Sequence, residues 1–113
     1  MIFYTTRIEC QCRGVVNMKK QFETGRLVAT AAVHNKMKSD EVFYRFCIMS
    51  FYRHGRGDWG DTCNEDRQLN DDALVNGDRV FSVYYYKGNP NESIWIITES
   101  DRSTTTILFP SDY

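Results

Sequence analysis

The segment His54–Asp61 holds the residue types with the greatest capacity for chemistry in this chain. It places an imidazole, two carboxylates and an indole among three glycines within eight residues. Glycine permits positive φ and a close approach of other groups. Loops are normally polar, so the large apolar surface of Trp59 is unusual there. The composition predicts either an anchored structural corner or a binding site.

Zinc is the metal that these residue types favour, because it binds imidazole and thiolate, and a closed structural site needs four such ligands. The candidate metal ligands are His54, Cys63, Cys10 and Cys12, with Asp58 or Asp61 as oxygen partners. The chain has no Cys-x-x-Cys pair, and four irregularly spaced cysteines do not form the framework of a secreted disulfide protein. Bound zinc and free thiols are therefore the two hypotheses.

Two kinds of catalysis fit the same segment. Cys63 near a helix N-terminus, with His54 as its base, has the pattern of a cysteine nucleophile. The i, i+4 spacing of Asp61 and Glu65 puts two carboxylates on one side of a helix, where they could hold Mg²⁺ or transfer protons. Acidic residues are also favoured at helix N-termini for electrostatic reasons alone. A capped, solvated helix face is the structural alternative.

Charge is distributed unevenly along the chain, although the formal net charge is only -1. Residues 58–78 contain seven acidic side chains and one basic side chain, a balance of -6, whereas residues 1–26 have five basic and two acidic side chains, or +3. Such an acidic face is expected to repel nucleic acid and to attract a basic protein. The predicted partner-binding residues are Asp58, Trp59, Asp61, Glu65, Asp66, Asp71 and Asp72.

Direct nucleic-acid binding is the weaker interpretation. Tyr84, Tyr85 and Tyr86 lie in a predicted strand and could stack bases. However, Arg79 and Lys87 are the only adjacent cations, and the isoelectric point is about 6.1. The electrostatic footprint of a nucleic-acid-binding protein is therefore missing.

Two helices are expected to flank the loop. Ser39 is a suitable N-cap for a helix that ends near Arg53 or His54, where glycines follow. Its apolar face would hold Val42, Phe43, Phe46, Cys47 and Ser50. At the end of this helix the dipole favours a protonated His54. A second helix begins near Asp61 or Asn64 and continues to Asn76, before Gly77.

Strands are predicted on both sides of these helices. Residues 25–30 alternate weakly, and period-two segments follow at residues 79–86, 94–99 and 104–109 with turn-rich connections between them. The predicted fold class is α+β, with a short N-terminal strand, two helices and then a three-stranded antiparallel meander that the helices cover on one face.

One domain is expected from a chain of 113 residues with 42% apolar and 26% charged side chains. No apolar run approaches the roughly 20 residues that span a bilayer, and charged residues interrupt the first 32 positions, so we expect a cytoplasmic protein. Residues 1–21 are interpreted as an N-terminal extension of residues 22–113. The extension is either disordered or contains an added edge strand within Ile2–Ile8.

Several short motifs occur in a fixed order from about Phe22 to Tyr113. They are Val28–Thr30, His54–Gly60, Glu65-Asp66 with Asn70, Trp95–Glu99, Asp101–Ser103 with Thr105-Thr106, and Phe109–Tyr113. In this order and spacing they resemble a family of small proteins carried on plasmids, integrative elements and phages, often labelled plasmid-related protein. The resemblance implies an accessory role on a mobile element and names no reaction or cofactor. Members are usually shorter than this chain at the N-terminus.

Three functional hypotheses follow from these observations. Small acidic-faced proteins of phages and plasmids often inhibit host defence, anti-CRISPR proteins among them, so the first is a non-enzymatic inhibitor of a host defence nuclease. The second is a small metal-dependent hydrolase or nuclease centred on His54, Asp58, Asp61 and Glu65. The third is a structural or regulatory module, with or without zinc, whose polar motifs hold the fold together.

Overall fold

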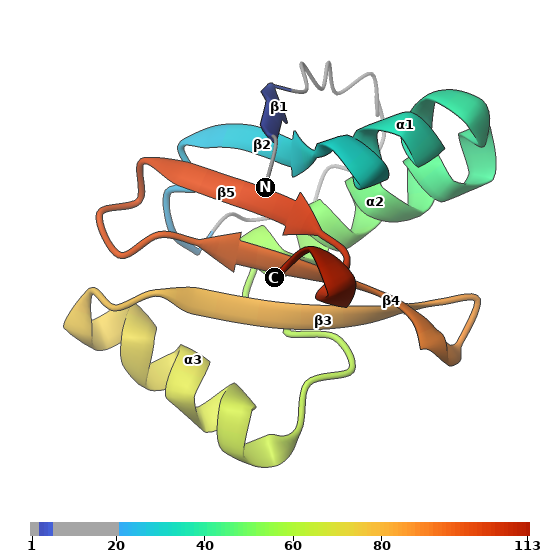
Figure 1. Cartoon of the computed structure of the whole chain (residues 1–113). Coiled ribbons are helices and arrows are strands. Elements are labelled where there is room, and N and C mark those ends of the chain that lie inside the picture. Colours follow the sequence, from blue (N-terminus) through green and yellow to red (C-terminus); the bar gives the residue numbers. More distant parts are fainter. Residues whose placement is uncertain (1–2, 6–20) are drawn as a thin grey trace, which may run out of the picture.

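Five strands form one mixed sheet in the order β1-β2-β5-β4-β3 in the computed structural model, which describes residues 3–5 and 21–113 (Figure 1). β3, β4 and β5 make the predicted antiparallel meander, whereas β2 runs parallel to β5 and antiparallel to β1. The α+β class is confirmed, and the sheet contains the four expected strands together with β1. The strands are β1 (Phe3–Thr5), β2 (Arg26–Thr30), β3 (Val80–Tyr86), β4 (Asn89–Thr98) and β5 (Thr104–Leu108).

An edge strand lies within Ile2–Ile8, as one of the two interpretations of the N-terminal extension expected. It covers Phe3–Thr5 and pairs with β2, Tyr4 standing opposite Ala29. Residues 1–2 and 6–20 lie outside the described residues, and so do the candidate zinc ligands Cys10 and Cys12.

The described residues also form three α-helices and a short 3-10 helix. Their bounds are α1 (Ala31–Ser39), α2 (Glu41–Gly55), α3 (Asn64–Asn76) and η1 (Pro110–Asp112). α2 and α3 match the two predicted helices, and α3 ends at Gly77 with φ of 75°. α1 was not predicted. It ends at Ser39, so the predicted N-cap of α2 was wrong by one position, and the Asp40 carboxylate caps α2 by accepting from the amides of Val42 and Phe43 at 3.1 and 3.2 Å.

The main core lies between one face of the sheet and the helices α1 and α2. Its buried side chains include Val33 and Met37 of α1, Phe43 and Cys47 of α2, and Tyr84 of β3. Alternate residues of β3 are buried, as the period-two pattern predicts. Val42, expected on the apolar face of α2, is 56% exposed instead.

α3 packs on the same face at the margin of the sheet, because Ala73 clusters with Val80, and Val80 points to the same side of β3 as Tyr84. It runs alongside β3 at the edge of the sheet (Figure 1). A second, smaller core lies there, where Trp59, Ala73 and Val80 are buried and Phe22 and Leu74 pack against them. The loop between α2 and α3 therefore lies between two cores. No helix in the described part of the chain is long and apolar enough to cross a membrane.

Candidate functional site at the 56–63 loop and helix α3

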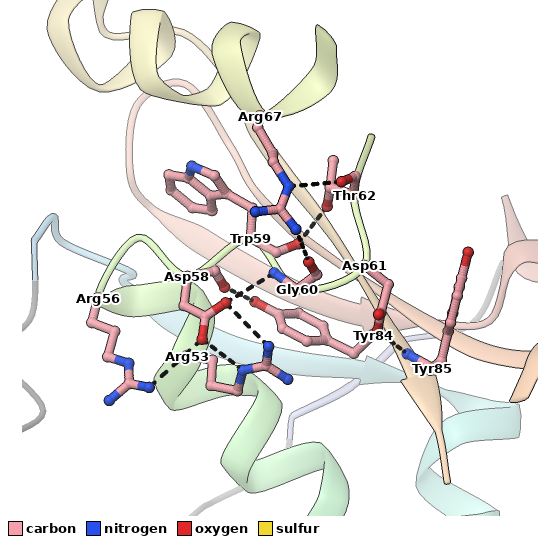
Figure 2. A network of polar contacts seen from close by, with 10 residues as sticks. All are labelled: Arg53, Arg56, Asp58, Trp59, Gly60, Asp61, Thr62, Arg67, Tyr84 and Tyr85. Carbon is pink, nitrogen blue, oxygen red and sulfur yellow. Dashed lines mark hydrogen bonds and ion pairs between the residues drawn. The ribbon is translucent and has the colours of Figure 1, made fainter. Parts of the chain in front are cut away.

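The loop between α2 and α3 covers the outer edge of β3. The amide of Asp61 donates to the carbonyl of Val83 at 2.7 Å, and the amide of Val83 donates to Thr62 Oγ1 at 3.2 Å. Two residues further along, the amide of Tyr85 donates to the Asp61 carboxylate at 2.9 Å (Figure 2). An exposed strand edge is a template for aggregation. Asp61 and Thr62 take the place of a neighbouring strand here.

Asn70 of α3 extends this cover to the beginning of β3. Its side-chain oxygen accepts from the amide of Phe81 at 3.0 Å, and its side-chain nitrogen donates to the carbonyl of the same residue at 2.5 Å. Both backbone groups of Phe81 are thereby satisfied by one amide side chain. Asn70 therefore holds α3 to the sheet.

Gly60 allows the loop to approach the sheet so closely. It has φ of 68°, and a Cβ at this position would lie 2.3 Å from the carbonyl oxygen of Val83 and 2.5 Å from Cδ1 of Tyr84. Glycine is therefore required twice here, for the backbone conformation and for the contact. The loop is also held to β3 two residues before Gly60, where the Tyr84 hydroxyl donates to the carbonyl of Asp58 at 2.8 Å.

The negative charge of Asp58 is compensated by two arginines of the same chain (Figure 2). Its carboxylate accepts from Nε and Nη2 of Arg53 at 2.8 and 3.1 Å, lies 3.6 Å from Nη2 of Arg56, and accepts from the amide of Gly60 at 3.1 Å. The hydrogen bond from Arg53 is the main reason that the pKa of Asp58 lies below its usual value. The Asp58 carboxylate is therefore already paired with arginines of its own chain.

Trp59 belongs to the second core. Its side chain is 4% exposed, and its ring centroid lies 6.0 Å from that of Phe22 and 5.8 Å from that of His54. The indole nitrogen donates to the Asp71 carboxylate of α3 at 3.0 Å. A buried aromatic whose polar atom has a partner stabilises the fold. Trp59 and Asp71, both predicted as partner-binding residues, thus contact each other inside this structure.

Arg67, the only basic side chain in the acidic segment, is directed at the loop. It donates from Nε to the carbonyl of Thr62 at 2.8 Å and from Nη2 to the carbonyl of Gly60 at 2.6 Å (Figure 2). The Thr62 hydroxyl in turn donates to the carbonyl of Trp59. These contacts fix the first turn of α3 to the loop.

His54 is fully buried at the end of α2, between hydroxyl groups of the sheet. Nδ1 lies 2.5 Å from Ser82 Oγ and Nε2 lies 2.8 Å from Thr98 Oγ1. The Thr98 hydroxyl also lies 2.7 Å from the Thr105 hydroxyl, and the Thr105 hydroxyl donates to the carbonyl of Thr24. Each hydroxyl has one proton, so Thr98 must donate to Thr105 and accept from Nε2. The neutral ring therefore carries its proton on Nε2 and accepts from Ser82 at Nδ1.

Burial, more than the nearby charge of Arg102, lowers the pKa of His54 to about 3. The expectation of a protonated imidazole was therefore wrong: the cost of removing the cation from water exceeds the benefit of the helix C-terminus. With both nitrogens hydrogen-bonded to hydroxyls, His54 has no free position for a metal. The pairing of His54 with Ser82 resembles that of a general base with a serine nucleophile. Both side chains are fully buried, however, so no substrate can reach them.

The two cysteines that the structure describes are both free thiols. Cys63 is exposed in the residue before α3, and Cys47 is buried in the main core, where burial raises its pKa to about 12. A thiol with a raised pKa is a poor nucleophile and a poor ligand at neutral pH. Residues 3–5 and 21–113 contain no group of three or more histidine, cysteine or acidic side chains able to hold a metal ion.

The outward face of α3 is the surface on which predicted partner-binding residues do come together. Glu65 and Asp72 are seven positions apart, two helical turns, and both are exposed. Neither forms an ion pair with another described residue, and the Asp72 carboxylate accepts only from Gln68 of the same helix, at 3.0 Å. Asp66 lies further round the helix and is partly buried.

Two apolar side chains on this face were not predicted as functional. Leu69 is 63% exposed and Val75 is 85% exposed. They lie three positions before and three positions after Asp72, so the three residues form one row along the helix. This spacing is visible in the sequence, but apolar residues in a helix normally indicate its buried face. We call Glu65, Leu69, Asp72 and Val75 the α3 surface.

Comparison of the chain with protein-family models, with curated proteins and with solved structures found no match in any of the three.

Proposed function

We propose that this protein is a non-enzymatic, protein-binding inhibitor that acts in the cytoplasm of a bacterial host. In this proposal the α3 surface occupies a basic, nucleic-acid-binding groove of a host defence nuclease of the CRISPR effector type. The mobile-element role comes from the resemblance of the motifs and stays a prediction. The mode of binding is inferred from the physical character of α3.

The observation that carries the proposal is the pairing of uncompensated carboxylates with exposed apolar side chains on one helix face. Glu65 and Asp72 have no cation of the described chain beside them, and Leu69 and Val75 are largely exposed. Charge complementarity steers a partner and sets the on-rate, while apolar side chains that become buried supply affinity. Both contributions are available on this one surface.

The attachment of α3 favours a preformed binding surface. Arg67, Asn70 and Asp71 hold the opposite side of the helix to the loop and to β3. A helix that is already fixed loses less conformational entropy on binding than one that must be ordered. Because Asp58 is neutralised and Trp59 is buried, the proposed contact residues are now those of the α3 surface.

A binding experiment with purified CRISPR effector nucleases tests the proposal. The variant Glu65→Lys/Asp72→Lys reverses the charge of the α3 surface without changing a contact to the loop. It should weaken binding by at least about tenfold, most strongly at low salt. Asp71 is left unchanged, because its substitution would also release the indole of Trp59.

Two further variants complete the design. Leu69→Ala should weaken binding at all salt concentrations, since its contribution is apolar. Glu92→Lys reverses one exposed charge on β4, outside α3, and should leave binding unchanged. Failure to find a complex with any effector, or equal affinities for the wild type and the charge-reversed variant, would overturn the proposal.

The metal-dependent hydrolase has no comparable support among the described residues. Three of its four candidate residues contact other parts of the fold: His54 contacts hydroxyls of the sheet, Asp58 two arginines, and Asp61 the amide of Tyr85. The fourth, Glu65, is exposed on α3.

A further inference from the structure

A hollow of about 300 Å³ lies away from α3 and is lined by residues of α1, α2, the β3–β4 hairpin and η1. Its volume is at the lower end of the range for small-molecule sites. It is lined by Lys36, Phe43, Tyr86, Asn91, Glu92, Ser93, Phe109, Pro110 and Ser111. No predicted site residue is among them.

Aromatic rings form the inner wall of this hollow. Phe43 and Tyr86 are buried, and their ring centroids lie 5.3 Å apart in a T-shaped arrangement. The ring of Phe109 lies 5.8 Å from that of Phe43. An apolar wall of this kind selects a ligand with an aromatic or branched aliphatic group.

The wall formed by η1 is held in place by one carboxylate. Asp112 accepts from the hydroxyl of Thr30 at 2.6 Å and from the amide of Phe109 at 3.0 Å, which ties the end of the chain to the beginning of α1. On the opposite side, the pairing of β3 with β4 shifts register between Tyr85 and Tyr86. Glu92 lies in the shifted part of β4.

A cation and an anion line the same hollow without neutralising each other. Nζ of Lys36 lies 4.7 Å from the ring centroid of Phe43 and 5.2 Å from that of Tyr86, and no carboxylate of the described chain lies within ion-pair distance of it. Among the residues that the structure describes, Glu92 accepts only from the side-chain amide of Asn89, at 3.3 Å. Two opposite charges beside an apolar wall are complementary to a small zwitterion with an apolar group.

We propose that this hollow binds a free α-amino acid with an aromatic or branched apolar side chain. Lys36 receives the α-carboxylate, Glu92 accepts from the α-ammonium group, and the side chain packs against Phe43, Tyr86 and Phe109. The proposal is independent of the α3 surface, with which the hollow shares no residue.

Titration of the full chain with L-phenylalanine, followed by calorimetry and by backbone amide chemical shifts, tests the proposal. Shifts are expected at the residues that line the hollow, and saturation is expected. 3-Phenylpropionate lacks the amine and phenethylamine lacks the carboxylate, so each should bind at least about tenfold more weakly than the amino acid. Equal binding of either analogue would refute the assigned pair of charges, and absence of saturable binding would refute the site.

Three variants assign the charges to residues. Lys36→Met keeps an apolar stem over the two rings and removes the cation, and Glu92→Gln keeps an acceptor for Asn89 and removes the anion. Each should weaken L-phenylalanine binding by at least about tenfold. Lys38→Met changes an exposed lysine of the same helix that does not line the hollow, and should bind as the wild type does. An undiminished affinity in Lys36→Met would overturn the proposal.

Discussion

Acid should destabilise this protein through His54, and the magnitude follows from its burial. The folded state holds the pKa of His54 at about 3, against an ordinary value of 6.5. Below pH 6.5 the unfolded chain binds a proton that the folded chain cannot bind, so stability falls as the pH falls. The loss is about 1.4 kcal/mol per pH unit, or about 2.7 kcal/mol at about pH 4.5. The charge of Arg102 also lowers the pKa of His54, whereas the Ser82 and Thr98 hydroxyls that contact the ring carry no charge.

Urea unfolding of the wild type and of His54→Gln, at about pH 7.5 and about pH 4.5, measures this contribution. Glutamine can also donate and accept, but it does not titrate. Carboxylates such as Asp58 titrate in both proteins and cancel in the comparison. The wild type should therefore lose about 2.7 kcal/mol more than the variant between the two pH values.

Parallel losses of stability in the two proteins would refute the reasoning. A second measurement does not depend on the variant folding. The imidazole ¹⁵N shifts of the wild type at about pH 5 should show a neutral ring protonated at Nε2, because the folded-state pKa is far below that pH. A charged ring, or a proton on Nδ1, would contradict the hydrogen-bond directions derived from Thr105 and Thr24.

Three further predictions concern the loop and its contacts, each measured as the free energy of unfolding. Gly60→Ala should cost more than Gly77→Ala, because both glycines have positive φ, worth about 1–2 kcal/mol, but only the first would clash with Val83. Equal costs would show that the close approach is unimportant. Asn70→Leu should cost about 1–3 kcal/mol by leaving the backbone of Phe81 without partners, and should promote aggregation through β3. A neutral effect would mean that water replaces the amide. Trp59→Ala should cost about 3–5 kcal/mol, as for a buried aromatic, and a stable variant would contradict its place in the core.

Local signals were sufficient for most of the secondary structure. Period-two segments at the end of the chain correspond to β3, β4 and β5, and in β3 alternate side chains meet the core along its whole length. Gly77 ends α3 as expected, since its positive φ is a property of the residue itself. α1 escaped prediction because only Val33 and Met37 of its nine residues are buried, which gives a weak helical pattern.

Long-range pairing could not be predicted in the same way. The parallel contact between β2 and β5 joins segments separated by the three helices and by β3 and β4. Neither segment carries a local sign of its partner. The same holds for α3, whose position along the edge of β3 depends on Asn70 meeting Phe81.

In the candidate site, the sequence by itself determined that His54–Asp61 is a special loop and that the helix after it is acidic. Tertiary structure decided which of those groups face solvent. It paired Asp58 with arginines, buried Trp59 in the second core with His54 beside it, and left Glu65 and Asp72 exposed beside Leu69 and Val75. The physical reason is that residue type fixes the charge and size of a side chain, whereas its desolvation and its partners depend on segments far away in the chain.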